Sequence, residues 1–335
     1  MRLSDIGEFG LIERIRKRLD QPDLEAHGMV GIGDDAAVMP VSGEELLVLT
    51  TDSMVEDVHF RRNWMTPYDI GWKAMVANVS DIAAVGGRPA HAVVTLAAPP
   101  DLEVEFVDAL IEGMADVAAE HGIRILGGDT VGTHRGVLVG VALTGFVERE
   151  SLLRRSGAKR GHALMVTGAL GASGTGLRLL EGGLNHLSRY AEAVQAHRRP
   201  NPRLKAARAL AATHAATACI DLSDGLAGDA QRLAEASGVG VRIALDRVPV
   251  AEVCQAACTR DLECDPLEVA LNGGEDYELL FTVPKSAADK VAERLAQAAN
   301  LEATVIGEIT ARARGVVGVQ ADGTEVPLAG GYHHF

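Results

Sequence analysis

The sequence lacks any run of 18 uncharged apolar residues, and its N-terminus lacks the apolar segment of a secretory signal. It is also poor in cysteine: no Cys-x-x-Cys pair and no histidine at metal-ligand spacing accompany Cys219, Cys254, Cys258 and Cys264. Because disulfide frameworks and zinc sites need such patterns, we expect these cysteines to be small buried hydrophobes in a reduced protein. These absences predict a cytoplasmic chain without membrane insertion.

Positive charge is scarce as well. The chain has 32 Lys plus Arg against 46 Asp plus Glu, a formal net charge of −14. Such a balance argues against nucleic acid or an anionic membrane as a partner, and an anionic substrate would need help from cations. The phosphate-binding pattern G-x-x-x-x-G-K-[ST] is absent, so any ATP binding does not use a P-loop.

What the sequence does contain is a series of aspartates in segments rich in Gly, Ser or Thr. The segments are Gly31-Ile-Gly-Asp34-Asp35, Thr50-Thr51-Asp52-Ser53, Asn78-Val-Ser80-Asp81, Gly127-Gly128-Asp129-Thr130 and Asp221-Leu-Ser223-Asp224-Gly225. Apolar runs such as residues 46–49 and 123–126 read as strands ahead of these segments. We therefore expect the carboxylates at strand ends, on loops where ligands collect.

Carboxylates gathered in one place would repel one another. Two of them about 4 Å apart cost roughly 4 kcal/mol at an effective dielectric near 20, unless cations lie between them. The candidate ligands are hard oxygens from Asp, Thr, Ser and the backbone, which favour magnesium shared with nucleotide phosphates. The pattern therefore predicts a site for phosphate chemistry.

One segment also satisfies a dinucleotide-binding pattern. Gly31-Ile-Gly33-Asp34-Asp35-Ala36 fits G-x-G-x-x-G/A, and Asp52 lies near the distance expected of a ribose-binding acid. We reject this interpretation because two carboxylates occupy the loop, and because Pro40 and Gly43 would interrupt the helix that should follow.

Three other features have two interpretations each. The glycines of residues 168–176 either cradle phosphate or make a tight strand-to-helix turn. Asp224 or Ser223 either binds metal or caps the next helix, and both roles are compatible. The acidic turn around Glu275 is either a solvated face or a carboxylate for a cationic ligand, whereas a lone histidine such as His59 is more often structural than catalytic.

Strands and helices alternate along the chain, which predicts an α/β protein of two domains, residues 1–149 and 150–335. Periodicity predicts helices at 11–19, 68–85, 106–121, 176–181, 203–214, after 224 and at 286–299. Apolar runs predict strands at 46–49, 92–96, 137–146, 163–167, 241–245 and 278–283. The charged, glycine-containing stretch 148–161 marks the boundary.

Taken together, these segments resemble the thiamine-monophosphate kinase family of the aminoimidazole ribonucleotide synthetase superfamily. The resemblance runs nearly end to end. Beyond the aspartate segments it rests on Gly7-Glu8-Phe9-Gly-Leu11-Ile12, Val58-His59-Phe60, Ile82-Ala-Ala-Val-Gly86, Arg155-Ser156-Gly157-Ala158 and Gly273-Gly274-Glu275-Asp276-Tyr277-Glu278-Leu279.

The resemblance implies a two-domain fold of that superfamily and a homodimer whose N-terminal sheets form a shared barrel. It also implies a cleft between the domains for ATP and several Mg²⁺ ions. Metal ligands, direct or through water, would be Asp35, Thr50, Thr51, Asp52, Asp81, Asp129, Asp221 and Asp224. ATP contacts would be Gly128, Asp129, Arg155 and Ser223. Substrate contacts would be His59, Glu275 and Tyr332, the last standing where the family often has tryptophan. Asp81, Asp129 and Asp221 would form the catalytic set.

The activity so implied is transfer of the ATP γ-phosphoryl group to thiamine monophosphate, without a covalent enzyme intermediate. The nearest rival is another ATP-dependent enzyme of the superfamily, such as one that activates an amide oxygen and closes a ring. A rival of another class is a non-catalytic nucleotide or metal sensor that uses the same loops.

Overall fold

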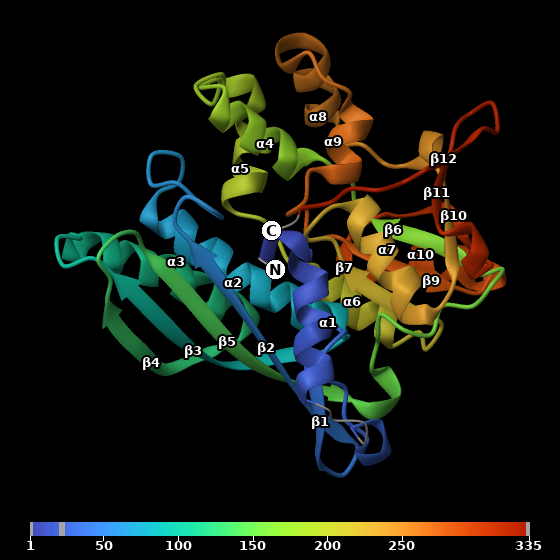
Figure 1. The fold of residues 1–335 in the computed structure, drawn as a ribbon, viewed down its shortest axis with the longest axis horizontal. Helices are drawn as coiled ribbons and strands as arrows, with labels where there is room; N and C mark the ends of the chain where they lie inside the picture. Colours follow the sequence, from blue (N-terminus) through green and yellow to red (C-terminus); the bar gives the residue numbers. More distant parts are fainter. Residues whose placement is uncertain (1–2, 20–23, 333–335) are drawn as a thin grey trace.

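The computed structural model describes residues 3–19 and 24–332, and it contains two β-sheets with helices packed on them (Figure 1). The first sheet has five strands in the order β1-β2-β5-β3-β4, antiparallel except for the parallel pair of β3 and β4. Its strands are β1 (Ala37–Ser42), β2 (Glu45–Val55), β3 (Arg88–Ala98), β4 (Arg124–Gly132) and β5 (Leu138–Glu148).

Two long helices, α2 (Pro67–Ala84) and α3 (Val104–His121), pack against this sheet and against each other. Glycine permits their close approach, because a Cβ on Gly71 would lie 1.9 Å from the Leu110 carbonyl oxygen. Thr66 begins α2 with a capping box shared with Asp69, which satisfies two of the free amides at the helix start. The amphipathic helix α1 (Gly7–Leu19) lies in front of both halves and has no buried residue.

The second sheet has seven strands in the order β12-β11-β8-β10-β6-β9-β7. Alternate residues of β6 serve two hydrophobic clusters, Leu164 in one and Met165 in the other, so helices cover both faces. The strands are β6 (Ala163–Thr167), β7 (Ala218–Asp221), β8 (Gly240–Ala244), β9 (Leu279–Val283), β10 (Ala303–Thr310), β11 (Val316–Val319) and β12 (Glu325–Pro327).

Helix α7 packs on one face of this sheet, while α6 and α10 pack on the other. A separate cluster joins α4, α5, α8 and α9, which lie together at the top of Figure 1. The helices are α4 (Ala172–Glu181), α5 (Ala191–Arg198), α6 (Leu204–Ala211), α7 (Leu226–Ser237), α8 (Glu252–Ala257), α9 (Pro266–Asn272) and α10 (Ala288–Ala299).

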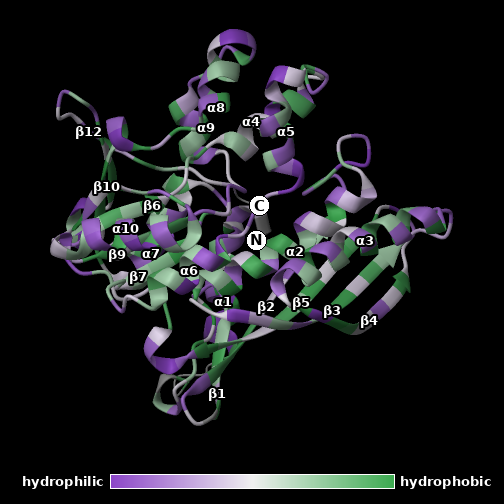
Figure 2. Ribbon diagram, turned by 180° about the vertical axis from the view of Figure 1, so that it is seen from behind, coloured by the Kyte–Doolittle hydropathy of each residue, from purple (hydrophilic) through white to green (hydrophobic). Residues whose placement is uncertain are grey.

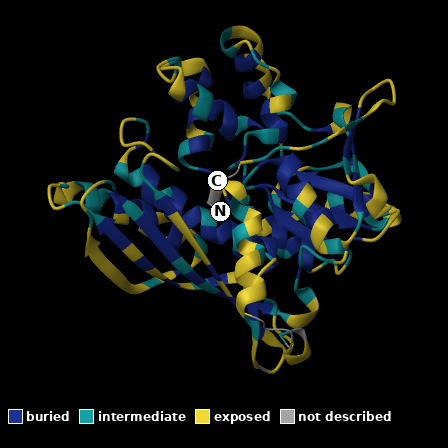
Figure 3. Cartoon of the chain, viewed as in Figure 1, coloured by how far each residue is buried: buried dark blue, intermediate teal, exposed yellow. Residues whose placement is uncertain are grey.

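Hydrophobic residues concentrate on the strands of both sheets (Figure 2), and most of these strands are buried. Strand β4 is exposed along almost its whole length (Figure 3), and two of the three residues of β12 are exposed as well. Among the described residues, no helix combines the length and the apolar character that crossing a membrane requires.

The sequence predicted the element types well and their lengths less well. Strand β6 occupies the predicted residues, whereas α4 begins at Ala172, four residues before the predicted start. The two-domain mixed α/β fold agrees with the prediction. The last strand of the first sheet ends at Glu148 and the next strand along the chain begins at Ala163, while the division at residue 149 stays a prediction.

The expectation that the aspartate segments follow strands on loops is wrong for most of them. Thr50-Thr51-Asp52 lies inside β2, Gly127–Thr130 inside β4, and Asn78–Asp81 inside α2. Pairing with neighbouring strands carries β2 and β4 beyond their apolar runs. Asp34-Asp35 precedes β1 instead of following a strand, and only Asp221 ends a strand as expected.

Candidate functional site

A cavity of about 1510 Å³ is lined by residues from both halves of the chain. It is larger than the usual small-molecule pocket and has room for two ligands. Most of the sequence-predicted site residues line it: Asp35, Thr50, Thr51, Asp52, His59, Asp81, Arg155, Asp221, Ser223, Asp224, Glu275 and Tyr332. Gly128 and Asp129 are not among its lining residues.

Three carboxylates meet in this cavity. Asp35, Asp81 and Asp221 each offer an oxygen within 4.8 Å of the others. One oxygen of Asp35, Oδ2, is buried without a hydrogen-bond partner in the described part of the chain. Hard oxygen donors at this spacing, with acceptor capacity left over, fit a divalent cation such as magnesium.

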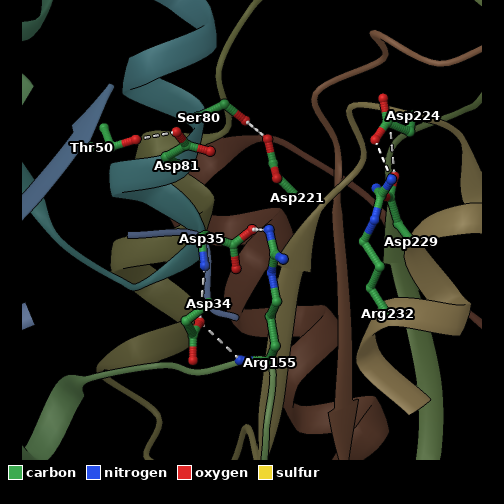
Figure 4. A network of polar contacts seen from close by, with 10 residues as sticks. All are labelled: Asp34, Asp35, Thr50, Ser80, Asp81, Arg155, Asp221, Asp224, Asp229 and Arg232. Atoms are coloured by element: carbon green, nitrogen blue, oxygen red, sulfur yellow. Dashed lines mark hydrogen bonds and ion pairs between the residues drawn. The ribbon is translucent and has the colours of Figure 1, made fainter. Parts of the chain in front are cut away.

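Strand β2 and helix α2 position the first part of this cluster (Figure 4). Thr50 and Asp52 are two residues apart on β2, so both face α2. The Thr50 hydroxyl donates to the Asp81 carboxylate, and the Asp52 amide donates to Asn78 Oδ1 at 3.1 Å. Thr51 has the opposite orientation, and its hydroxyl donates to the Val141 carbonyl at 3.0 Å.

Helix α2 also contacts the second half of the chain. The Ser80 hydroxyl donates to Asp221 Oδ2 at 2.6 Å, which links α2 to the end of β7 (Figure 4). Asp81 and Asp221 come from different halves of the chain, so the cluster forms only when both halves pack together. This junction explains why the two residues are 140 positions apart in sequence yet share a site.

Burial and mutual repulsion disturb the titration of these acids. Burial, followed by Asp52, Asp221 and Asp35, raises the pKa of Asp81 well above its ordinary value. Burial and then Asp35 do the same to the pKa of Asp221. Burial and mutual repulsion therefore oppose the ionised forms of these acids, and a bound cation would favour them.

Arg155 is the principal counter-charge. Its guanidinium Nη2 donates to Asp35 Oδ1 at 2.8 Å, and its backbone amide donates to Asp34 Oδ1 at 3.2 Å (Figure 4). Burial and the neighbouring Asp35 still raise the pKa of Asp34 to about 6. One guanidinium thus compensates only part of the local negative charge.

Asp224 lies beside the cluster, and its Oδ2 is 2.5 Å from Arg232 Nη2 (Figure 4). Arg232 also forms an ion pair with Asp229. The expectation that Asp224 or Ser223 caps α7 is wrong, because Gly225 is the N-cap residue and no side chain caps the helix. Instead the Asp224 amide donates to Asp229 Oδ2 at 3.1 Å. Asp224 therefore keeps its carboxylate directed at Arg232 and the cavity.

The three residues assigned to the substrate line the same cavity. His59 Nδ1 accepts a hydrogen bond from the Val55 amide at 3.0 Å. The Tyr332 amide donates to the Asp224 carbonyl at 3.1 Å, and its side chain is exposed. Residues 333–335, which follow Tyr332, lie outside the described residues.

Glu275 is held by partners that the sequence did not indicate. Its carboxylate lies 2.6 Å from Lys73 Nζ and 3.2 Å from His197 Nδ1. Burial alone would raise its pKa, but the Lys73 ammonium and His197 hold the pKa of Glu275 at about 2. Its backbone has φ 55°, and its amide donates to the Ser223 carbonyl at 2.7 Å.

The glycine-rich segment 168–176 makes a tight turn into α4. Gly171 has φ 89°, and its amide donates to Asp276 Oδ2 at 2.8 Å, while the Ser173 amide lies 3.3 Å from Asp276 Oδ1. Asp276 thus occupies the amides that a phosphate would need. The tight-turn interpretation fits the structure and the phosphate-cradle interpretation does not.

Sequence reasoning missed several residues of the site: Lys73, Asn78, Ser80 and His197. Lys73, Ala77 and Asp81 recur every four residues on α2 and all line the cavity, so helical spacing from Asp81 could have found Lys73. No signal in the sequence pairs His197 with Glu275, because they are far apart in the chain.

Gly128 and Asp129 lie on β4, the edge strand of the first sheet, and are exposed. Strands β5 and β3 separate β4 from β2, where Asp52 lies. Strand β2 has a free edge of its own, because β1 pairs only with residues 45–49 and no described strand continues along residues 50–55 on that side.

Comparison with known proteins gives matches over nearly the whole chain. Residues 33–147 match the AIR synthase related protein N-terminal domain, and residues 159–320 match the C-terminal domain. Thiamine-monophosphate kinase of Bacillus subtilis (strain 168) is 36% identical over 335 residues, covering 98% of this chain and 100% of the relative. That of Escherichia coli (strain K12) is 36% identical over 341 residues, covering 98% of each. The solved structure of AaThiL complexed with AMPPCP and TMP superposes with a TM-score of 0.86 at 36% identity, covering 100% of this chain and 99% of the other.

Proposed function

The chain belongs to the AIR synthase related family and, within it, to the thiamine-monophosphate kinases, and we propose that it converts thiamine monophosphate and ATP to thiamine diphosphate and ADP. The observation that carries this proposal is the cavity in which carboxylates from both halves converge beside the partly buried Arg155. The related AaThiL has been solved in complex with AMPPCP and TMP, which fits a cavity with room for two ligands.

The reaction forms one bond and breaks one. A phosphate oxygen of thiamine monophosphate attacks the γ-phosphorus of ATP, and the bond from that phosphorus to the β,γ-bridging oxygen breaks to release ADP. The acceptor needs little help from a base, because a phosphate monoester with a second pKa near 6 is largely deprotonated at neutral pH. The chain's task is therefore to align two anions and neutralise their charge.

We assign the metal ligands as Asp35, Thr50, Thr51, Asp52, Asp81, Asp129, Asp221 and Asp224, directly or through water. When bound there, Mg²⁺ would neutralise phosphate charge. Arg155 and Ser223 contact the nucleotide in this proposal, and the rigid links of Thr50 to Asp81 and of Ser80 to Asp221 hold the carboxylates in place. His59 and Tyr332 contact the thiamine phosphate.

We further propose a homodimer in which the first sheets of two copies join into a barrel. The free edge of β4 and the free edge of β2 at residues 50–55 support it, because exposed edges are templates for pairing. Placing β4 of one copy on β2 of the other would bring Asp129 of the partner subunit beside Thr51 and Asp52. This arrangement gives Gly128 and Asp129 a role that one copy alone does not provide.

We place the enzyme in the cytoplasm, since its four cysteines are free thiols and reduced thiols persist there. Nucleic acid and membrane surfaces are not proposed as partners of a chain with net charge −14.

The direct test is incubation of the purified chain with magnesium, ATP and thiamine monophosphate, followed by chromatography for thiamine diphosphate. ADP formation that depends on thiamine monophosphate is the expected result. ATP turnover with an amide acceptor and no diphosphate product would favour the ring-closing relatives. Nucleotide binding without turnover would favour a sensor.

A further inference from the structure

Lys73 is the one charged side chain among the largest fully buried side chains in the described part of the molecule, and the reaction outlined above gives it no role. Its side chain is 1% exposed, yet it lines the cavity. Its Nζ lies 2.6 Å from Glu275 Oε1 and has no other hydrogen-bond partner among the described residues. A lysine ammonium has three N–H donors, so at least one donor is directed to no protein group.

Glu275 has spare capacity of the opposite kind. An ionised carboxylate accepts at about four lone-pair positions, and Lys73 and His197 occupy one on each oxygen. The Glu275 side chain is 26% exposed and lines the cavity. An unfilled donor and an unfilled acceptor therefore lie side by side at this end of the cavity.

The pair is also neutral overall. Burial and then the Lys73 ammonium lower the pKa of His197, so its ring is uncharged at neutral pH. The charge of Glu275 is thus balanced by Lys73, and little of it remains for a cation such as the thiazolium ring. A neutral ligand group with an adjacent hydrogen-bond donor and acceptor matches the Lys73–Glu275 pair better.

Helix α2 fixes the position of the Lys73–Glu275 pair relative to the carboxylate cluster. Lys73 and Asp81 are eight residues apart, which is about 12 Å along the helix axis, and both line the cavity. The carboxylate cluster takes the phosphates at the Asp81 end. The organic end of an extended phosphate ester would reach the Lys73 end.

We propose that Lys73 and Glu275 together recognise the aminopyrimidine ring of thiamine monophosphate, Lys73 donating to a ring nitrogen and Glu275 accepting from the exocyclic amine. This inference rests on the proposed kinase function. His197 is a positioning residue, because it holds the second carboxylate oxygen of Glu275 and leaves its lone pairs directed at the cavity. The pair is then a specificity determinant for the acceptor and not for ATP.

The test compares thiamine monophosphate with an analogue in which hydrogen replaces the exocyclic amine. For the wild-type protein we expect kcat/KM to fall by roughly 10²-fold with the analogue, because a site built to bond an amine is left with an unpaired acceptor. In the double variant K73M/E275L, which removes both the donor and the acceptor, both substrates should be used at nearly equal, reduced kcat/KM. The KM for ATP should remain within about threefold of wild type.

The double variant is chosen because K73M alone leaves a buried carboxylate without its counter-charge. K73M should therefore have a lower Tm than K73M/E275L, and circular dichroism would identify any loss of fold. Lys290→Met, at an exposed position on α10, is the matched control and should keep wild-type discrimination.

This design distinguishes failure of the recognition role from failure of the proposed kinase function. If K73M/E275L is folded and still prefers thiamine monophosphate by the wild-type factor, the recognition role is wrong while the kinase function stands. If the wild-type protein forms no thiamine diphosphate at all, the proposed function fails first.

Discussion

Single atoms with unused bonding capacity mark the two ends of the cavity. At one end Asp35 Oδ2 is buried without a hydrogen-bond partner in the described structure, and at the other Lys73 Nζ has only its ion pair. Unsatisfied buried groups cost stability, so a protein that keeps them does so where a ligand supplies the missing partner. Both atoms line the cavity that we assign to the substrates.

Asp221→Asn should separate activity from stability. The amide keeps the shape of the side chain and can still accept from the Ser80 hydroxyl, but it removes one charge from three mutually repelling carboxylates. We expect turnover to fall by about 10²-fold or more. In a metal-free buffer the Tm should rise by about 1–2 °C, because the repulsion is smaller.

Scanning calorimetry measures the Tm of each protein in EDTA and in Mg²⁺. Formation of thiamine diphosphate measures the turnover. Mg²⁺ should raise the Tm of the wild-type protein and have a smaller effect on the variant. Asp289→Asn, at an exposed position on α10, is the control and should change neither quantity. Near-normal turnover in Asp221→Asn would remove this carboxylate from the site.

Glu275 should give the protein a pH-dependent stability at low pH. Its pKa is held at about 2, below the ordinary value of 4.5, so the folded protein binds this proton less readily than the unfolded chain. The stabilisation is present above about pH 4.5 and is lost as pH falls toward 2. The groups that face Glu275 are Lys73 and His197. Protonation of Glu275 removes the negative charge that stabilises them.

The comparison is between wild type and Glu275→Gln by urea unfolding. The wild type should be more stable by about 3 kcal/mol at pH 7, since the variant leaves Lys73 without its counter-charge. The difference should be constant from pH 8 to 5 and narrow below about 4.5. A difference that grows on acidification would contradict the ion pair.

Helix α2 is the element on which both ends of the cavity depend. One of its faces carries Lys73, Ala77 and Asp81 into the cavity, and another packs against α3 through Gly71. A shift of this helix would move the carboxylate cluster and the Lys73 end together. Packing remote from the chemistry therefore controls the geometry of the site.

Gly71→Ala tests this dependence. The new Cβ would lie 1.9 Å from the Leu110 carbonyl oxygen, so α2 and α3 must move apart. We expect a loss of about 3 kcal/mol in the free energy of unfolding and a fall in kcat/KM for both substrates. Gly132→Ala meets no atom within 4 Å and should stay within about 0.5 kcal/mol of wild type. Wild-type stability in Gly71→Ala would show that the helices do not pack this closely.

The sequence was sufficient for the types and order of these elements, because hydrophobic periodicity reports which face of a helix or strand is buried. It was insufficient for the setting of the aspartate segments. Thr50 and Asp52 lie within β2 because β5 pairs with the strand over its whole length, and a strand partner leaves no local signal. Asp81 lies within α2, as the helix predicted at residues 68–85 implied, although its Gly/Ser/Thr-type segment was also expected to lie on a loop.

The site residues also divide into those that the sequence identifies and those that only the structure identifies. Those in glycine-rich acidic segments, such as Asp35 and Asp221, could be selected from the sequence by their chemistry alone. His197 could not, because it is a single residue on an ordinary helix and acquires a role only through contact with Glu275. Lys73 could be found only indirectly, through its helical spacing from Asp81. Tertiary contacts of this kind are invisible to local patterns.

The whole molecule raises the question of what covers β4. This strand ends the first sheet and is exposed along its length, with Leu126 65% exposed. A long exposed edge with apolar side chains is a liability that proteins usually cover. The second copy in the proposed barrel is the occupant that also uses the free edge of β2.

Leu126→Lys should disrupt this association. A charged side chain in the joined sheet would be desolvated without a partner, so we expect a shift from dimer to monomer and a parallel loss of activity. Light scattering after size-exclusion chromatography measures the mass, and circular dichroism checks the fold. Lys290→Glu, which changes charge at an exposed position of the second half, should leave the dimer intact. A wild-type protein that is monomeric and fully active would exclude the barrel.

Asp129 provides the decisive test, because strands β5 and β3 separate its strand, β4, from β2 within one copy. If Asp129 acts in the partner's cavity, each site of a homodimer combines Asp221 of one copy with Asp129 of the other. Asp129→Asn and Asp221→Asn should then both be inactive alone. A heterodimer of the two variants, isolated through two affinity tags, would contain one intact site and should recover about half of wild-type activity. If Asp129 serves its own copy, each site of that heterodimer lacks one carboxylate and no activity returns. Recovery therefore requires both the dimer and the exchange of Asp129 between its subunits, whereas its absence, with the heterodimer confirmed by mass, would place Asp129 outside the partner's site.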